Sequence, residues 1–141
     1  MEMRSSLGRA RGLGSTKDGV GHWWAQRVTA IALVPLSIWF VFAAIGLMGA
    51  DFATFQAWIG TFGNALMMVV LVLVLFYHAH LGMQVVIEDY VSRESCKVMT
   101  LLLVKFALFM LAVSCVLAVF LVAYRGLIKN AYSVSDHRSR L

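Results

Sequence analysis

Three long apolar stretches, separated by short polar segments, dominate the pattern of residues along the chain. They cover about residues 28–47, 64–87 and 101–124, and each reaches the roughly 20 apolar residues needed to cross the hydrocarbon core of a bilayer. A soluble domain of this size has no interior large enough to bury so much apolar surface. The pattern therefore predicts an all-α integral membrane protein with three transmembrane helices.

The polar segments divide the chain into three parts. Residues 1–21, rich in Gly, Arg and Ser, are expected to form a polar N-terminal tail, because nothing in them can build a core. The tail lacks the apolar region of a secretory signal. Residues 22–125 are expected to form the three-helix membrane domain, and residues 126–141 a polar C-terminal tail. Pro35 lies inside the first span, where a membrane helix tolerates it with a local kink.

Composition and charge agree with a membrane location. Of the 141 residues, 61% are hydrophobic and 13% are charged, and the net charge is +5. The basic residues sit at helix ends and in the tails, where they orient the chain or meet anionic lipid head groups, so a nucleic-acid partner is not expected. Lys105, near the start of the third span, is expected to snorkel towards the surface.

The distribution of basic residues predicts an orientation. The N-terminal side is rich in them, whereas the first connection, residues 48–63, has none. The positive-inside rule then places the N-terminus in the cytoplasm of a bacterium, in the inner membrane, or in the matrix if the membrane is the mitochondrial inner membrane. The basic C-terminal tail argues for the reverse, but the first helix usually dominates insertion. The N-terminal basic residues are Arg4, Arg9, Arg11, Lys17 and Arg27.

Two histidines, His78 and His80, interrupt the apolar second span. Polar groups at that depth are costly, so they usually face the bundle interior and have a partner. At about 100° per residue the two imidazoles point to nearly opposite faces, and they cannot bind one cofactor from the same side.

Gly82 distinguishes the two histidines, because it lies one turn from His78 on the same face. A residue without a side chain there allows a flat macrocycle to approach the backbone, which makes His78 the better candidate for an axial haem ligand. The alternative is that the histidine only forms a hydrogen bond to a neighbouring helix.

Asp89 and Tyr90 end the second span. Asp89 lies close to three turns from His78, about 16 Å along the axis. A phenol and a carboxylate at a membrane surface suit a quinone head group, whose carbonyl oxygens need hydrogen-bond donors and whose reduction consumes protons. The alternative is that Tyr90 is an interface anchor and Asp89 a solvated loop residue. Arg27, at the head of the first span, is a candidate partner of a haem propionate or lipid phosphate, or a plain positive-inside anchor.

These residues carry a resemblance to a known family. Over about residues 22–125 the chain resembles the hydrophobic membrane anchors of succinate dehydrogenase, the respiratory complex II. The similar residues are His78-Ala79-x-x-Gly82-Met83, followed by Asp89-Tyr90, with Arg27-Val28-Thr29-Ala30 opening the first span. His80 occupies a position that varies in the family, so an exchange of the ligand role between the two histidines stays open.

The resemblance implies a partner and cofactors. Such an anchor bundles with a second three-span protein, the cytochrome b subunit, and a b-type haem lies between them. It implies that His78 is the axial ligand from this chain, with Gly82 packing on the haem. Tyr90 would then hydrogen-bond ubiquinone, with Asp89 beside it, and Arg27 would lie near the haem propionates or the quinone pocket.

The resemblance also implies that the catalytic chemistry belongs to other subunits. A flavoprotein subunit oxidises succinate, an iron–sulfur subunit passes the electrons on, and ubiquinone accepts them at the membrane. Two alternatives stay open: the anchor of a quinol–fumarate reductase, and a structural or assembly membrane protein without a cofactor. This chain itself contains no nucleotide-binding loop, flavin-binding pattern or cysteine cluster, since Cys96 and Cys115 lie far apart.

Overall fold

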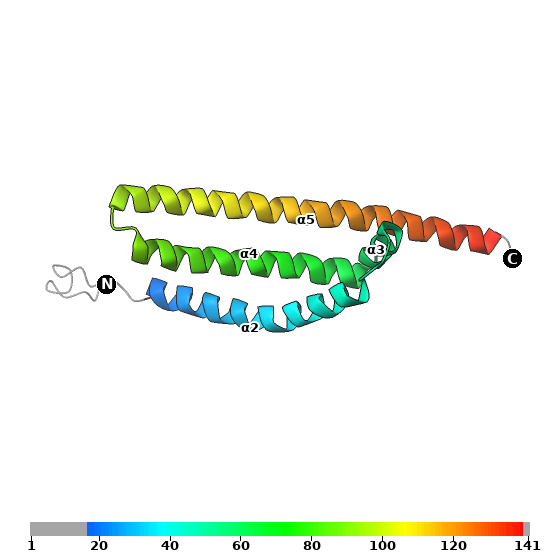
Figure 1. The fold of residues 1–141 in the computed structure, drawn as a ribbon, viewed down its shortest axis with the longest axis horizontal. Coiled ribbons are helices and arrows are strands. Elements are labelled where there is room, and N and C mark those ends of the chain that lie inside the picture. The colour runs from blue at the N-terminus through cyan, green and yellow to red at the C-terminus, as the bar shows by residue number, and fades with distance from the viewer. Residues whose placement is uncertain (1–16, 140–141) are drawn as a thin grey trace, which may run out of the picture.

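The computed structural model describes residues 17–139 of the chain. In this part of the chain four α-helices form and no strand occurs. They are the long α2, Lys17–Gly46, the short α3, Phe52–Ile59, and the long α4, Phe62–Tyr90, and α5, Glu94–Ser139 (Figure 1). The predicted N-terminal tail therefore lies mostly outside the described residues, and its last residues already belong to α2.

The three long helices contain stretches that are long and apolar enough to cross a membrane. These stretches are Val20–Gly46, Phe62–Tyr90 and Glu94–Lys129, and the predicted spans fall within them to within one residue. The prediction of an all-α protein with three membrane-spanning helices is thus confirmed for the described part of the chain.

The long helices form an open layer with α4 in the middle (Figure 1). Within residues 17–139, α4 contacts both α2 and α5, but α2 and α5 do not contact each other. Few apolar side chains are buried as a result; they are Leu36, Ile59, Leu71, Leu81 and Ile87. Most of the apolar surface is left for lipid or for another protein chain, because bilayer tails are as apolar as the side chains themselves.

The layer has two distinct ends. The end that holds the turn between α4 and α5, residues 91–93, also holds the start of α2, and it is called the turn end below (Figure 1). The opposite end holds α3 and the C-terminal part of α5, and it is called the α3 end. The N-terminal side and the 88–100 connection thus share one end, as the orientation argument requires.

Helix α2 is bowed along its length (Figure 1), and Pro35 lies near its middle. Proline has no N–H, so it cannot donate to the carbonyl one turn earlier, and its ring crowds that carbonyl. The helix is continuous through Pro35, as expected, and is curved along its length.

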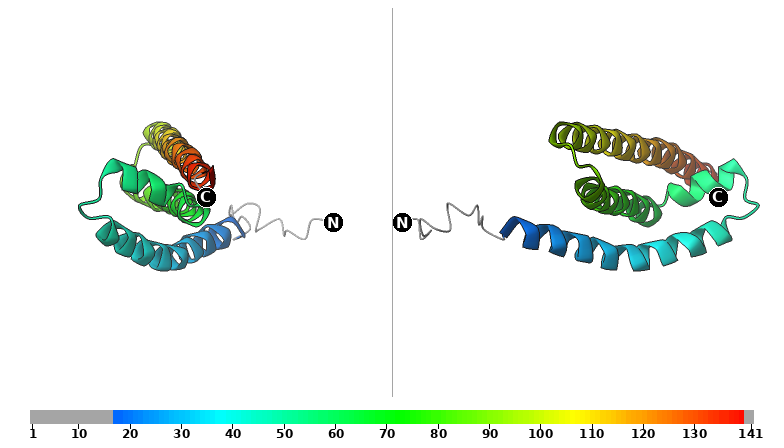
Figure 2. Two further views of the ribbon diagram at one scale, coloured as in Figure 1. Left: turned by 90° about the vertical axis from the view of Figure 1, so that its right-hand side faces the viewer. Right: turned by 60° about the vertical axis from the view of Figure 1, so that its left-hand side comes forward.

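Helix α3 is an element that the apolar pattern did not reveal. Asp51 is its N-cap, and the backbone N–H of Thr54 donates to the Asp51 carboxylate over 2.9 Å. At its other end Gly60 packs directly on Gly126 of α5: a Cβ at Gly126 would stand 2.0 Å from the carbonyl oxygen of Gln56. Figure 2 shows α3 crossing at this end of the layer.

Helix α5 continues well past the predicted end of the third span, residue 124, and reaches Ser139. Its 46 residues measure about 69 Å at about 1.5 Å per residue, more than twice the roughly 30 Å hydrocarbon core. The predicted polar C-terminal tail is therefore largely a helical extension that projects beyond the α3 end.

Candidate functional site

His78 lies on the face of α4 that meets α2, where both ring nitrogens have neighbours. Its Nδ1 lies 2.8 Å from the hydroxyl oxygen of Thr29, and its Nε2 lies 3.5 Å from the amide nitrogen of Gln26. The Thr29 hydroxyl also lies 2.7 Å from the carbonyl oxygen of Ala25, to which it donates its single proton. Thr29 therefore accepts from His78, and the hydrogen-bond pattern assigns the proton of the imidazole to Nδ1.

This tautomer leaves a lone pair on Nε2 of His78, and the Gln26 amide is the group that faces it. A metal-bound histidine usually donates its other ring N–H to a nearby oxygen, which fixes the ring orientation. The Thr29 hydroxyl provides such an oxygen and is itself buried. The residues present at this corner thus fit an imidazole that binds iron through Nε2.

Within residues 17–139, two further polar atoms at this corner are buried without a hydrogen-bond partner: Nε2 of His22 and Oε1 of Gln26. Buried polar atoms are nearly always paired, so these two are candidates to meet a water, a ligand or another part of the protein. Gly82 lies near Gln26: a Cβ added at Gly82 would stand 3.7 Å from the Gln26 amide nitrogen, an ordinary contact. In the single chain, the space over Gly82 is therefore bordered by a flexible side chain and not by backbone.

His80 lies on a different side of α4. It lines a groove between α4 and α5, together with Lys105, whereas His78 contacts α2. The prediction that the two imidazoles point to different faces is thus confirmed. They cannot serve one group from the same side.

Asp89 and Tyr90 are the last two residues of α4, at the turn end, and both are exposed. The Tyr90 side chain is 85% exposed, so its phenol is free to meet a ligand or another chain. Arg27 is also exposed, and its guanidinium carbon lies 4.9 Å from the centroid of the Trp23 ring, a cation–π contact. Within the described residues, no hydrogen bond brings Arg27 together with Asp89 or Tyr90.

The sequence analysis gave no role to Thr29, which it named only as part of the resemblance, or to Gln26, although a signal was present. His22, Gln26 and Thr29 follow one another at spacings of four and three residues, so they form a polar stripe on one face of an otherwise apolar helix. Such a stripe at membrane depth indicates a partner on the facing helix. That partner is His78.

The fold and the site together define a class: a three-span helical membrane protein with an oriented imidazole within its middle span and an exposed tyrosine where that span ends. Comparison with known proteins agrees. The family model of the succinate dehydrogenase/fumarate reductase transmembrane subunit matches residues 1–123. The chain belongs to this family.

Relatives extend the match over most of the chain. The succinate dehydrogenase hydrophobic membrane anchor subunit of Rickettsia bellii is 34% identical over 125 residues, which is 89% of this chain and 98% of that protein. The protein of the same name from Rickettsia conorii is 31% identical over 126 residues, with the same coverage. The succinate dehydrogenase membrane anchor subunit of Reclinomonas americana is 31% identical over 64% of this chain and 78% of that protein. No solved structure matches.

Proposed function

We propose that this chain is the membrane anchor of a succinate dehydrogenase in a bacterial inner membrane. Family membership and the relatives named as such anchors support this role. The open layer supports a second three-span protein, the cytochrome b subunit, as the partner that covers it. The flavoprotein and iron–sulfur subunits then dock at the turn end, and the N-terminus lies on the same cytoplasmic side.

The observation that carries the proposal furthest is the hydrogen bond between His78 and Thr29. Thr29 holds the imidazole with the proton on Nδ1, so Nε2 is ready to be an axial ligand of a b-type haem shared with the partner chain. The haem supplies one-electron chemistry when bound. For the haem to bind, the Gln26 side chain would move away from Nε2 of His78. Because Gly82 has no side chain, a flat group could approach the surface of α4 beside His78.

In this proposal, ubiquinone binds at the turn end of the layer. Tyr90 offers an exposed phenol as a donor to a ubiquinone carbonyl, and the neighbouring Asp89 is a carboxylate through which a proton reaches that place. Arg27 contributes a fixed positive charge at the head of α2, suited to a haem propionate or to the quinone pocket. Because all three side chains are exposed, the site is completed only when other subunits surround it.

Haem content of the purified complex tests the ligand assignment. We expect the wild-type chain, isolated in mild detergent with its co-purifying subunits, to show a b-type reduced-minus-oxidised spectrum. His78→Ala should remove the spectrum and His80→Ala should retain it. Gly82→Ala, which the single chain accommodates, should lower the haem content by crowding the macrocycle. A spectrum that survives His78→Ala and disappears with His80→Ala would assign the ligand to His80.

One observation favours a second function, a cofactor-free structural or assembly protein. The Thr29–His78 hydrogen bond already links two helices, which is a sufficient role for a membrane histidine. Absence of haem and of a co-purifying flavoprotein would establish that role. Within the family, a quinol–fumarate reductase anchor has the same fold, and rates of succinate oxidation and fumarate reduction in isolated membranes distinguish the two reactions.

A further inference from the structure

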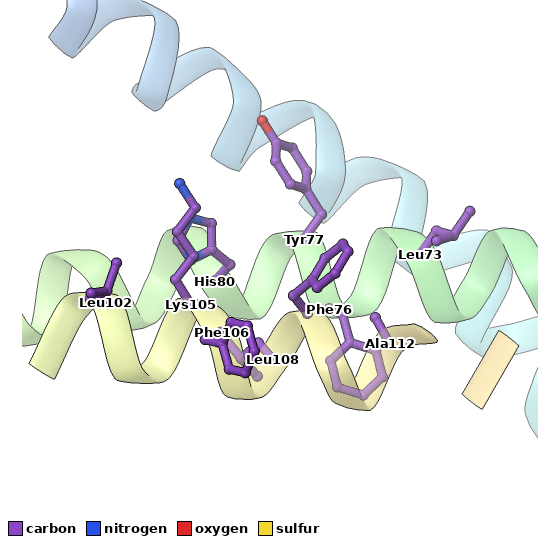
Figure 3. A pocket seen from close by; sticks show the side chains of 10 residues that line it. Leu73, Phe76, Tyr77, His80, Leu102, Lys105, Phe106, Leu108 and Ala112 are labelled. Atoms are coloured by element: carbon purple, nitrogen blue, oxygen red, sulfur yellow. The ribbon is translucent and has the colours of Figure 1, made fainter. Parts of the chain in front are cut away.

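A groove runs between α4 and α5 on the side of α4 away from His78. Its volume is about 610 Å³, within the range of ligand-binding sites. Figure 3 shows His80 and Lys105 close together on its lining, with apolar side chains from both helices following along the groove. The apolar part includes Phe76, Phe106, Phe109 and Ala112.

Lys105 lacks a counter-ion at its own depth. Helix α5 has no acidic residue between Glu94 and Asp136, and residues 20–46 of α2 and 62–87 of α4 have none either. A charged side chain within a membrane span is costly unless it is paired or reaches the surface. The membrane spans of this chain provide no anion at this depth, so an anionic group that meets Lys105 on the groove has to come from outside them.

His80, which lines the groove together with Lys105, lies close to the expected level of the lipid head groups. Thr29 lies opposite His78, and Trp24 lies five residues nearer the turn end, about 7.5 Å along α2. His80 lies two residues, about 3 Å, beyond His78 in the same direction. The cationic end of the groove is thus less than one turn deeper than a tryptophan of the kind that marks the membrane interface.

We propose that the groove binds an anionic phospholipid. The phosphate lies against the Lys105 ammonium, with the His80 imidazole beside it, and an acyl chain follows the groove past Phe76 and Phe109. From His80 to Leu73 the groove extends over seven residues, about 10 Å into the hydrocarbon core. This occupant satisfies both halves of the lining at once, because it is charged where the lysine is and apolar where the phenylalanines are.

The test measures lipid selectivity in the complete complex. The purified complex is placed in vesicles of phosphatidylcholine, and spin-labelled phosphatidylglycerol and phosphatidylcholine are compared for retention on the protein. Lys105→Gln should reduce the preference for the anionic lipid about fivefold, the contribution of one basic residue near an anionic surface. Lys97→Gln is the matched control, since Lys97 lies on the same helix and at the same end but does not line the groove.

A second variant tests the apolar half. Ala112→Phe fills the groove without a change of charge, so retention of both labelled lipids should fall there while haem content and the set of co-purifying subunits stay unchanged. The proposal is wrong if Lys105→Gln equals the wild type, or if Lys97→Gln causes the same loss. It is equally wrong if quinone leaves the complex with Ala112→Phe, or if neither lipid reaches the groove in the wild type because another protein chain fills it.

Discussion

At the α3 end, the C-terminus of α3 packs on α5 backbone against backbone. At the turn end, α2 and α4 instead meet through polar side chains, and within the described residues some of their atoms lack a hydrogen-bond partner. The α3 end is closed: Gly60 packs on Gly126, and Ile59 is only 1% exposed. The Trp58 ring stacks on Trp39 and Phe55, with centroids 6.0 and 6.3 Å away. Glycines such as Gly60 and Gly126 allow membrane helices to approach closely, which matters because no hydrophobic driving force brings helices together in lipid.

The turn end is open by comparison. In the part of the chain that the structure describes, Nε2 of His22 and Oε1 of Gln26 have no hydrogen-bond partner there, and the phenol of Tyr90 is exposed. One end is completed by its own sequence, and the other is arranged to be completed by the cofactor, quinone and subunits proposed above.

The largest effect of a single substitution is expected at the closed end. Gly126→Ala would place a Cβ 2.0 Å from the carbonyl oxygen of Gln56 and 3.1 Å from Cα of Gly60, so backbone has to move. Overpacking of this kind costs about 1–3 kcal/mol or more. The free energy of unfolding in mixed micelles, followed by tryptophan fluorescence, should fall by that amount.

Gly63→Ala is the matched control for that substitution. It lies in the first turn of α4, and a Cβ there meets nothing within 4 Å. Its unfolding curve should match or slightly exceed the wild type, because alanine is the better helix former. Equal destabilisation by the two variants would show that the α3 end is not held by the glycine contact.

A smaller effect on stability, but a specific one on the cofactor, is expected at the open end. Thr29→Val keeps the shape of the side chain and removes the acceptor of His78 Nδ1–H. Side-chain hydrogen bonds in membranes average about 0.6 kcal/mol and reach about 1.7, so the single chain should lose that much stability. In the complex, loss of such an orienting partner typically weakens metal binding about 10–100-fold.

Haem transfer to an apo-globin acceptor measures the second effect, and Thr29→Ser supplies the control. Serine restores the hydroxyl, so the rate of haem loss should return towards the wild-type value if the hydrogen bond is what matters. If Thr29→Ser loses haem as fast as Thr29→Val, the effect belongs to packing of the methyl group instead. The unfolding free energies of the two variants then distinguish a local change from a general one.

The apolar pattern was sufficient for the three spans because a membrane helix must satisfy its backbone internally, and length and hydropathy then fix it. Helix α3 was not predicted from this pattern, because length and hydropathy do not determine it. It is only eight residues long, and its position depends on Gly126, far along the chain from its N-cap and therefore invisible to any local pattern. The helical continuation of α5 was not predicted either, because a polar segment can prolong a helix without forming an apolar face.

The candidate site divides in the same way. Helix periodicity alone separated His78 from His80, because both lie on one continuous element. The Thr29 partner required knowledge of which faces of α2 and α4 meet, which is a tertiary fact. The assignments of haem, quinone and partner chains rest on the family resemblance. A single chain carries only part of a site that several chains share, so its residues alone do not identify the ligand.

The smallest predicted effect concerns Asp51, the exposed cap of α3. Hydrogen bonding to Thr54, through its side chain and then its backbone N–H, holds the pKa of the Asp51 carboxyl below its usual value of 3.8, and Lys129 adds a weaker attraction. A lowered folded pKa means that the cap is fully stabilising above the unfolded pKa and is lost as the pH falls through the folded one. Docking of α3, reported by Trp58 fluorescence in detergent, should therefore weaken only in the acid range below about pH 4. Asp51→Asn keeps a side-chain oxygen that caps the helix but does not titrate, so its fluorescence should stay flat over that range. An acid transition that persists unchanged in Asp51→Asn would assign it to another carboxyl group.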